Sequence, residues 1–226
     1  MKRQSRKRPR RPRAKHRKTP AAARARTSTS RATPPLLVIG LTGPNASGKG
    51  EVAKFLAARG FAVQSLSDVV RDEATRRGLD HSRDSLIRVG VELRIEGGPG
   101  ALARRILPRL RRRAAVDSIR NPGEVEVLRT LPRFVLLGID APQALRFQRS
   151  ILRGRLGDGA TLEEFARKES RENSTTEAGQ QLLATLALAD RVINNDGTIE
   201  DLHERTRRAL AGVLDADPRS GRKHRR

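Results

Sequence analysis

The sequence predicts an α/β fold with a mostly parallel five-stranded sheet and helices on both sides of it. Three observations support this class. From Pro35 onward, short apolar runs alternate with longer amphipathic stretches, as in parallel sheets with helical crossovers. Five of the apolar runs have strand length. The chain has 226 residues, 36% of them hydrophobic, which suffices for one ordinary domain, expected at 34–217.

The first elements follow directly from the apolar pattern. The run LLVIGL at 36–41 is continuous rather than alternating, so we expect a buried central strand. A helix should follow the glycine-rich loop after it, because Val52 and Phe55 recur at helical spacing and Gly60 is a stop signal. A second, weaker strand is expected at 61–66.

The rest of the domain continues the alternation. Residues 68–112 suggest three successive helices, separated near 78–80 and at the glycine-rich 96–100. Strands are expected again at 114–119, 133–139 and 191–194. The intervening helices are expected at 122–131, 142–153, 161–173 and 175–188. A last helix should follow Thr198, with Asp201 completing an approximate capping box.

Both ends of the chain differ from the domain in charge. Residues 1–33 contain 14 Lys or Arg and no acid, and residues 218–226 contain 5 more without an acid. Subtracting these 19 from 48 leaves 29 basic residues against 25 acidic ones in between. We expect both ends to be disordered, because they repel themselves and have little to bury. The N-terminal segment could bind nucleic acid, be a solvated arm, or result from a start codon assigned too far upstream.

Missing residue types exclude several classes of function. The chain has no cysteine, which excludes disulfides, thiolate zinc sites and cysteine nucleophiles. No apolar run approaches the roughly 20 residues of a membrane-spanning helix, and no secretory signal is present. The absence of Trp and Tyr argues against base-stacking platforms. We therefore expect a cytoplasmic protein without membrane contact.

A phosphate-binding loop is predicted in GLTGPNASGKGEVAKFL, residues 40–56. Its glycines allow the backbone to curl so that successive N–H groups face one anion, and the following helix adds its dipole. The lysine can then reach the β and γ phosphates. The expected phosphate-binding residues are Gly43, Asn45, Ala46, Ser47, Gly48, Lys49, Gly50 and Glu51. The usual pattern G-x-x-x-x-G-K-[ST] has a hydroxyl where this chain has Gly50.

This loop resembles that of the P-loop nucleotide kinases, in particular the adenylate kinase and dephospho-CoA kinase group. The resemblance covers about residues 36–212 and implies a three-layer P-loop NTPase fold, ATP as substrate and Mg²⁺ as cofactor. Adenylate kinases also have Gly directly after the loop lysine, followed by Thr. This chain departs from them at Glu51, whose carboxylate cannot donate to phosphate but could hold a magnesium-bound water.

The segment SLSDVVRDEATRRG at 65–78 is similar to the acceptor-binding segment of adenylate kinases. The match implies that Asp68 caps a helix and positions the site, while Arg71 grips the acceptor phosphate. A capped surface helix with an exposed arginine is the alternative. The segment 78–112 is expected to cover the acceptor. It supplies three arginines as phosphate or carboxylate contacts: Arg83, Arg88 and Arg94.

The segment VDSIRNPGEVEVLR at 116–129 is similar to the D-G-F-P-R segment of adenylate kinases. The match implies that Asp117 orients magnesium, directly or through water, and that Arg120 contacts the transferring phosphate. Glu124 either pairs with Arg120 and fixes its direction or starts the next helix, and we favour the helix start.

An arginine-rich region follows. Arg146, Arg149 and Arg153 lie at spacings of three and four, so they share one helix face. This resembles the lid of the nucleotide kinases, whose arginines close over the phosphates and neutralise charge in the transition state. Arg149 and Arg153 are the expected lid residues, because no acid lies within four residues of either. A helix face carrying Arg–Glu pairs is the alternative.

These features predict an ATP-dependent phosphotransferase acting on a nucleotide-like acceptor, either a nucleoside monophosphate or dephospho-CoA. Lys49 would hold the donor phosphates, and Arg71 and Arg94 the acceptor. Charge on the transferred group would be stabilised by Arg120, Arg149 and Arg153. Asp117, with Glu51, would serve magnesium.

Two alternatives remain open from the sequence. A nucleotide-binding sensor or regulatory domain with little turnover is one, because Gly50 and Glu51 remove both hydroxyls commonly found after the lysine. A similar kinase-like domain occurs fused to deoxycytidylate deaminases, although the deaminase zinc site itself needs cysteines. The other is a nucleic-acid-binding protein that acts through the basic tails.

Overall fold

The computed structural model describes residues 37–154 and 159–214, so the basic ends predicted at 1–33 and 218–226 lie outside the described residues. The sheet has five strands, all parallel, in the order β2-β3-β1-β4-β5. The strands are β1 (Leu37–Thr42), β2 (Ala62–Ser65), β3 (Arg113–Ile119), β4 (Phe134–Asp140) and β5 (Arg191–Asn194). The helices are α1 (Lys49–Ala57), α2 (Leu66–Arg76), α3 (Arg83–Gly97), α4 (Ala101–Ile106), the 3-10 helix η1 (Leu107–Arg109), α5 (Pro122–Arg129), α6 (Gln143–Arg153), α7 (Leu162–Glu172), α8 (Leu182–Ala187) and α9 (Ile199–Ala209).

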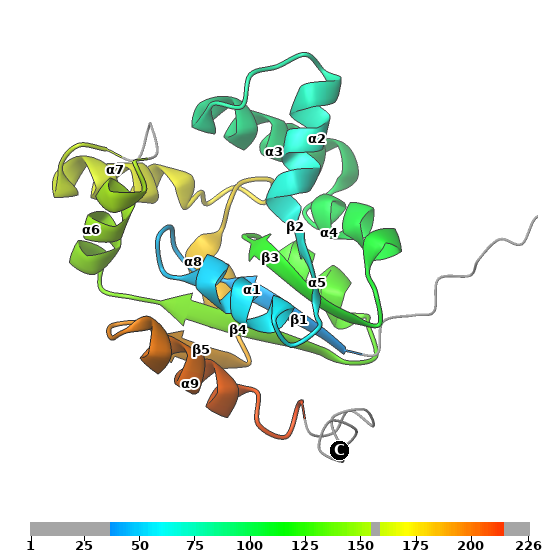
Figure 1. Cartoon of the computed structure of the whole chain (residues 1–226). Coiled ribbons are helices and arrows are strands. Elements are labelled where there is room, and N and C mark those ends of the chain that lie inside the picture. The colour runs from blue at the N-terminus through cyan, green and yellow to red at the C-terminus, as the bar shows by residue number, and fades with distance from the viewer. Residues whose placement is uncertain (1–36, 155–158, 215–226) are drawn as a thin grey trace, which may run out of the picture. The chain divides into compact units, whose positions relative to one another are not determined.

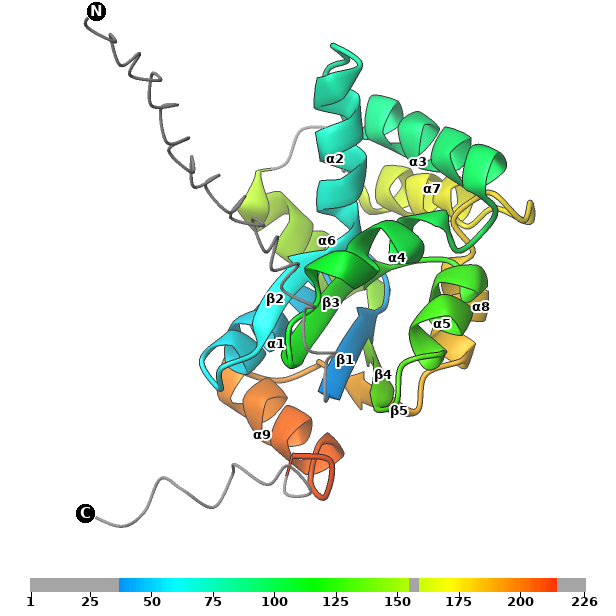
Figure 2. The ribbon, with the colours of Figure 1, turned by 90° about the vertical axis from the view of Figure 1, so that its right-hand side faces the viewer.

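The sheet is the middle of three layers (Figures 1 and 2). Leu37, Ile39 and Leu41 of β1 pack with α1 and α9, whereas Val38 packs with α2, α3, α4 and α5. This alternation is expected because successive side chains of a strand point to opposite faces. Both faces of β1 are therefore covered, which explains why its sequence is a continuous apolar run.

The strand order places the predicted phosphate loop. From β1 the chain passes to β2 and β3 on one side of it, and then to β4 and β5 on the other side. The carboxyl end of β1 is therefore the topological switch point of the sheet, where a ligand crevice opens in doubly wound folds. The loop at 43–48 lies at this point, between β1 and α1.

Helices α6 and α7 form a unit beside the phosphate loop, at the carboxyl edge of the sheet (Figure 1). They pack on each other through Phe147 and Phe165, whose ring centroids lie 5.9 Å apart. Phe165 is the buried residue of α7, and most of the remaining surface of both helices is polar. This unit corresponds to the region that resembles a kinase lid.

All five predicted strands are confirmed, and their ends differ from the prediction by at most one residue. The sheet is parallel throughout. Across the described ranges, no helix combines the length and apolar composition that crossing a bilayer requires.

The helix predicted at 175–188 is wrong over its first half, because α8 begins only at Leu182. The preceding residues form a turn that is bound to the β3–α5 connection. The Asn121 side-chain amide donates to the carbonyl oxygens of Glu177 at 2.8 Å and Gly179 at 2.9 Å. Side-chain hydrogen bonds of this kind give the backbone an alternative to the helix.

Candidate functional site

The phosphate loop has a backbone that requires glycine at two positions. The φ angle is 136° at Gly43 and 108° at Gly48. A Cβ at Gly43 would lie 2.0 Å from the Ile139 carbonyl oxygen, and a Cβ at Gly48 would lie 2.2 Å from Asn195 Nδ2. Gly48 is also the N-cap of α1, so the loop opens directly onto a helix N-terminus. This is the backbone arrangement that binds phosphate.

Lys49, the first residue of α1, folds its side chain back over this loop. Its Nζ donates to the carbonyl oxygens of Gly43 and Pro44, both at 2.7 Å. Burial, and then the charge of Arg120, lower the pKa of Lys49 to about 7, while Asp117 acts in the opposite direction. Phosphate oxygens beside Lys49 would favour its charged form, so the position suits an anion-binding lysine.

Asn195 ties the loop to the end of the last strand. Its side-chain amide donates to the Ser47 carbonyl oxygen at 2.8 Å, and its own N–H donates to the Asp140 carbonyl oxygen at 2.7 Å. The Ser47 hydroxyl is buried and has no hydrogen-bond partner within the described part of the chain. A hydroxyl at this position is available to donate a hydrogen bond to a phosphate oxygen.

Asp117 and Arg120 lie on either side of a strained turn at the end of β3. Ser118, between them, has φ 65°, which is unusual for a residue other than glycine. The Asp117 carboxylate accepts the Ser118 N–H at 2.6 Å. Both Asp117 and Arg120 act on the pKa of Lys49. The three residues predicted to be catalytic in the first half of the domain are therefore brought together.

The two carboxylates predicted to serve magnesium lie in different surroundings. Glu51 accepts from Lys54 at 2.9 Å, on the surface of α1, whereas Asp117 lies near the end of β3, where its charge acts on Lys49. Residues 37–154 and 159–214 contain no group of three or more His, Asp or Glu suited to a metal ion. In phosphoryl-transfer sites Mg²⁺ uses one or two carboxylates, substrate phosphates and waters. Asp117 fits this requirement, and Glu51 is tied to Lys54.

The three arginines of α6 have different partners. Arg146 is buried, donates to the Ala141 carbonyl oxygen at 2.9 Å, and forms an ion pair with Glu169 of α7. Its Nη1 also lies 3.4 Å from the Asn45 carbonyl oxygen of the phosphate loop. An Arg–Glu pair is therefore present, but it connects two helices and the loop rather than lying on one helix face.

Arg149 and Arg153, the two expected lid residues, are more exposed than Arg146. Arg149 donates to the Asn195 carbonyl oxygen at 3.0 Å, and burial, followed by the charge of Arg153, lowers its pKa. Arg153 is exposed, and its charge contributes to the lowered pKa of Lys49. Both therefore add positive charge around the loop.

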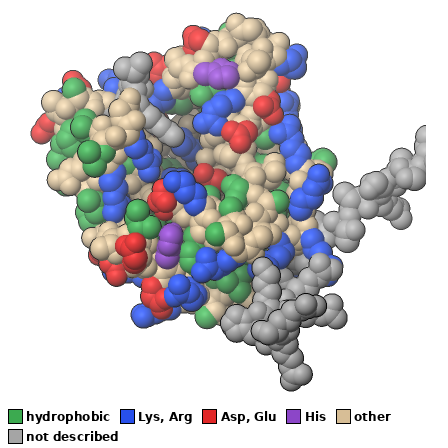
Figure 3. Space-filling view, in the orientation of Figure 1, with side chains coloured by type: hydrophobic (Ala, Val, Ile, Leu, Met, Phe, Trp, Pro, Cys, Tyr) green, Lys and Arg blue, Asp and Glu red, His purple; other side chains and the backbone are tan. Residues whose placement is uncertain are grey.

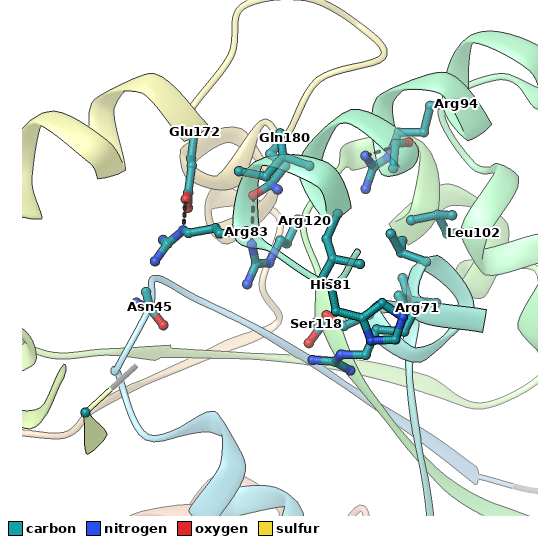
Figure 4. A pocket seen from close by; sticks show the side chains of 17 residues that line it. Asn45, Arg71, His81, Arg83, Arg94, Leu102, Ser118, Arg120, Glu172 and Gln180 are labelled. Atoms are coloured by element: carbon teal, nitrogen blue, oxygen red, sulfur yellow. Dashed lines mark hydrogen bonds and ion pairs between the residues drawn. The ribbon is translucent and has the colours of Figure 1, made fainter. Parts of the chain in front are cut away.

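A cavity of about 580 Å³ adjoins the loop, and we call it the inner cavity. It is lined by α2, α3, the end of β3, Asn45 of the phosphate loop and the ends of α6 and α7 with the turn that follows α7 (Figure 4). Four arginines line it: Arg71, Arg83, Arg94 and Arg120. Leu66, Val70, Leu86, Ile87 and Leu102 add an apolar wall. In the space-filling view, basic side chains gather around this hollow (Figure 3).

Arg83 and Arg120 face the turn after α7. Arg83 forms an ion pair with Glu172, and Arg120 Nη1 donates to the Gln180 side-chain oxygen at 2.9 Å (Figure 4). The Nε of Arg120 is buried and has no hydrogen-bond partner among the described residues. Burial lowers the pKa of Arg120, which makes a bound anion a favourable neighbour.

Glu124 starts a helix, as predicted. With Asn121 it forms a capping box at the start of α5, and its carboxylate accepts the Arg120 backbone N–H at 2.8 Å. The other carboxylate oxygen accepts from Arg94 at 2.7 and 3.1 Å. Glu124 is fully buried and Arg94 is nearly so. Arg94 thus lines the inner cavity as one half of a buried ion pair.

The prediction that Asp68 caps α2 is wrong. Ser65 is the cap, and its hydroxyl accepts the Ser67 N–H at 3.2 Å. Serine reaches the second helical N–H from the position just before the helix, whereas Asp68 already lies in the first turn. Asp68 instead pairs with Arg71 at 2.5 Å on the exposed side of α2.

Sequence analysis missed Glu172 and Gln180 as cavity residues. Both reach the cavity because the turn after α7 folds back against the β3–α5 connection, where the Gln181 N–H donates to the Arg120 carbonyl oxygen at 2.9 Å. Glu172 ends the segment 161–172 that belongs to the lid-like region, but nothing there marks it as a cavity residue, and no motif surrounds Gln180. Ser118 was missed as well, because its backbone strain leaves no trace in its residue type.

Comparisons with known proteins agree with this architecture. No model of a known protein family matches the chain. The chain is 34% identical over 187 residues to the UPF0200 protein PH1008 of Pyrococcus horikoshii, and the match covers 79% of the chain and 98% of the relative. Among solved structures, TT1252 from Thermus thermophilus has a TM-score of 0.55 at 24% identity, covering 80% of this chain and 99% of the other. A shikimate kinase from Acinetobacter baumannii, in complex with shikimate, has a TM-score of 0.51 at 14% identity, covering 81% and 96%. These likenesses show a P-loop kinase-like fold.

Proposed function

The chain belongs to the UPF0200 protein family, and from the site on its P-loop kinase-like fold we propose that it is an ATP-dependent phosphotransferase acting on a nucleotide-like acceptor. One observation carries the proposal: an arginine-lined cavity opens beside the phosphate loop and shares Asn45 with it. A protein that only binds ATP needs the loop alone. A second anion-binding cavity at the same edge of the sheet provides a binding site for an acceptor.

The donor phosphates would lie on the loop N–H groups and on Lys49. As they bind, Lys49 exchanges the two loop carbonyls for phosphate oxygens and regains its full charge. Bound magnesium supplies charge neutralisation at the phosphates, and Asp117 is the residue that would hold it, directly or through water.

Transfer of the phosphoryl group requires little covalent chemistry from the protein, because such reactions depend on positioning and electrostatics. Arg120 both acts on Lys49 and lines the inner cavity, so it is our candidate for contacting the transferred group. Arg149 and Arg153 would add positive charge from the α6 side when the lid closes and excludes water.

The acceptor would bind in the inner cavity. Within residues 37–154 and 159–214, the ion-pair partner of Arg71 is Asp68, and both side chains are substantially exposed. Exposed pairs of this kind contribute little, roughly 0–1 kcal/mol, so Arg71 can exchange Asp68 for an acceptor phosphate. Arg94 keeps Glu124 as its partner, so the buried pair is neutral overall and contributes a fixed polar wall. The apolar wall suits a base or another uncharged part of the acceptor.

The test is a coupled assay for ADP release by the full chain with ATP and magnesium, screened against nucleoside monophosphates, deoxynucleoside monophosphates and dephospho-CoA. We expect acceptor-dependent release that Lys49→Ala abolishes. Lys54→Ala is the matched control, because Lys54 lies on the same helix and is 75% exposed. Binding of ATP without release by any acceptor would overturn the proposal.

A nucleotide sensor is the second candidate, and the observation that favours it is the start of α1. Gly50 provides no hydroxyl there, and Glu51 is engaged with Lys54. A Cβ at Gly50 would meet no atom within 4 Å, so Gly50→Ser should fold normally. Turnover that appears only in Gly50→Ser would favour the sensor, and equal turnover in both proteins would favour the kinase.

A further inference from the structure

A second cavity of about 840 Å³ lies between the start of α3, the end of α7 and the turn that follows α7. We call it the outer cavity. It shares His81, Arg83, Ile87, Glu172 and Gln180 with the inner cavity. Because five residues line both, the two cavities are direct neighbours, and the Arg83–Glu172 ion pair lies at their boundary.

Helix α3 provides a continuous surface from one cavity to the other. Arg94 lines only the inner cavity and Val91 only the outer one, while Arg83 and Ile87 line both. Residues four apart form a ridge that drifts slowly around a helix. The ridge Arg83, Ile87, Val91 therefore leads out of the inner cavity and into the outer one.

The outer cavity offers groups suited to a phosphate-linked polar chain. Lys168 and Arg171 of α7 join Arg83 as cations, and Asp84 and Glu172 are the acids in its lining. Ser174 and Thr176 supply hydroxyls, and Ile87 and Val91 supply apolar surface. A mixture of cations, hydroxyls and apolar surface fits a ligand with both charged and uncharged parts.

The wall of the outer cavity is anchored by hydrogen bonds. The Ser174 N–H donates to the Gln180 carbonyl oxygen at 2.6 Å, and the Gln181 N–H donates to the Arg120 carbonyl oxygen at 2.9 Å. Asn121 binds the carbonyl oxygens between them. The turn that forms this wall is thus held by the same connection that carries Arg120, which preorganises the cavity.

We propose that the two cavities form one acceptor site, in which the outer cavity binds an arm linked through phosphate. The acceptor is then a diphosphate-bridged nucleotide rather than a nucleoside monophosphate. The inner cavity alone, at about 580 Å³, already has the size of ordinary ligand sites, roughly 300–1,000 Å³. Arg83 at the boundary contacts the bridging phosphates in exchange for Glu172. This inference rests on the proposed function, because it names the class of acceptor.

The test is calorimetric binding of AMP, ADP-ribose and dephospho-CoA to the full chain. We expect both extended compounds to bind at least about tenfold more tightly than AMP, a difference of about 1.4 kcal/mol. Val91→Trp fills the outer cavity and should remove that advantage while AMP binding is unchanged. Ile95→Trp is the control, because Ile95 lies one turn further along α3, is 70% exposed and lines neither cavity.

A charge reversal gives an independent test if Val91→Trp does not fold. Arg171 is exposed and lines the outer cavity, whereas Arg167, one turn earlier on α7, is exposed and lines neither. We expect Arg171→Glu to weaken both extended compounds by several-fold without affecting AMP, and Arg167→Glu to change neither.

Equal affinity of the wild-type chain for AMP and the extended compounds would overturn the inference, as would equal losses for all three ligands in Val91→Trp or Arg171→Glu. The binding experiment tests the two-part site independently of the proposed kinase activity. The expected binding pattern without acceptor-dependent ADP release would support the two-part site and reject the kinase. Equal kcat/KM for AMP and the extended compounds would support the kinase and reject the two-part site.

Discussion

Lys49 lies among positive charges even before a phosphate binds, and this links nucleotide binding to pH. Its pKa in the free protein is about 7, against 10.5 for an ordinary lysine. Phosphate oxygens raise this pKa again, so binding above pH 7 takes up a proton. Below pH 7 Lys49 already carries its proton. The affinity for ATP should therefore be greatest below pH 7 and fall as the pH rises above it.

Calorimetry at pH 8 in two buffers of different ionisation enthalpy measures this uptake, and we expect about one proton per ATP. Lys49→Arg is the control, because arginine stays protonated throughout this range and should take up none. Equal uptake by both proteins would assign the proton to another group.

The buried Arg94–Glu124 pair should be important for stability. Glu124→Gln leaves the Arg94 guanidinium buried without its counter-charge, since the two side chains are 4% and 0% exposed. Loss of one partner of such a pair costs about 3–5 kcal/mol in the free energy of unfolding. Glu51→Gln, which breaks the exposed pair with Lys54, should cost less than about 1 kcal/mol. Urea denaturation of both variants measures the difference, and similar losses would contradict it.

At the scale of elements, two capping boxes provide a matched pair of tests. Asn121 caps α5 and also binds the turn after α7, whereas the side-chain hydrogen bonds of Thr198 to the described residues lie within the α9 cap. Thr198→Ala should cost about 1 kcal/mol, the usual value of a cap. Asn121→Ala should cost about 2–3 kcal/mol, because the buried Gly179 carbonyl oxygen and the part-buried Glu177 carbonyl oxygen also lose their donor.

The two variants should also differ in the assay. Asn121→Ala loosens the turn that holds Gln180 against Arg120, so KM for the acceptor should rise while KM for ATP changes little. Thr198→Ala should leave both values unchanged. An unchanged acceptor KM in Asn121→Ala would show that the turn does not shape the acceptor site.

The strands and the phosphate loop were predictable because their signals are local. The continuous apolar run of β1 reflects burial on both faces, and Gly43 and Gly48 mark a backbone that other residues cannot adopt. The turn before α8 was not predictable. Its hydrogen bonds to Asn121 join residues 56 and 58 positions apart. Contacts over that distance depend on the completed fold, and a short window of sequence does not contain them.

The same reason limited the prediction of the site. The loop residues, Asp117 and Arg120 follow strands whose ends meet at one edge of the sheet, so their proximity follows from the strand order. Gln180 reaches Arg120 across 60 positions, through a turn that had been predicted as helix. Arg94 was predicted as an acceptor contact, but its pairing with Glu124 was not predicted, because the two residues lie on different helices.

For the whole molecule, ATP binding should raise the thermal stability of the domain. The reason is that residues of β1, α1, β3, α6 and the end of β5 all contribute to the site. A ligand at 100 times its Kd stabilises the native state by about 2.7 kcal/mol. For a domain of this size that corresponds to a rise in Tm of roughly 5–10 °C. Thermal denaturation with and without ATP should show this rise in the wild-type chain and in Lys54→Ala. Lys49→Ala should lack it, and an equal rise in Lys49→Ala would mean that ATP binds elsewhere.

The bond from the Asn195 side chain to the Ser47 carbonyl oxygen spans 148 positions. On the ribosome, the loop is translated long before its tether exists, and at about 5–20 residues per second the delay is roughly 7–30 s. A nascent chain that stalls before β5 therefore contains every residue of the phosphate loop but lacks Asn195, whose hydrogen bond holds the loop in place. We therefore expect ATP binding to begin late in biosynthesis, after nearly the whole domain has been translated.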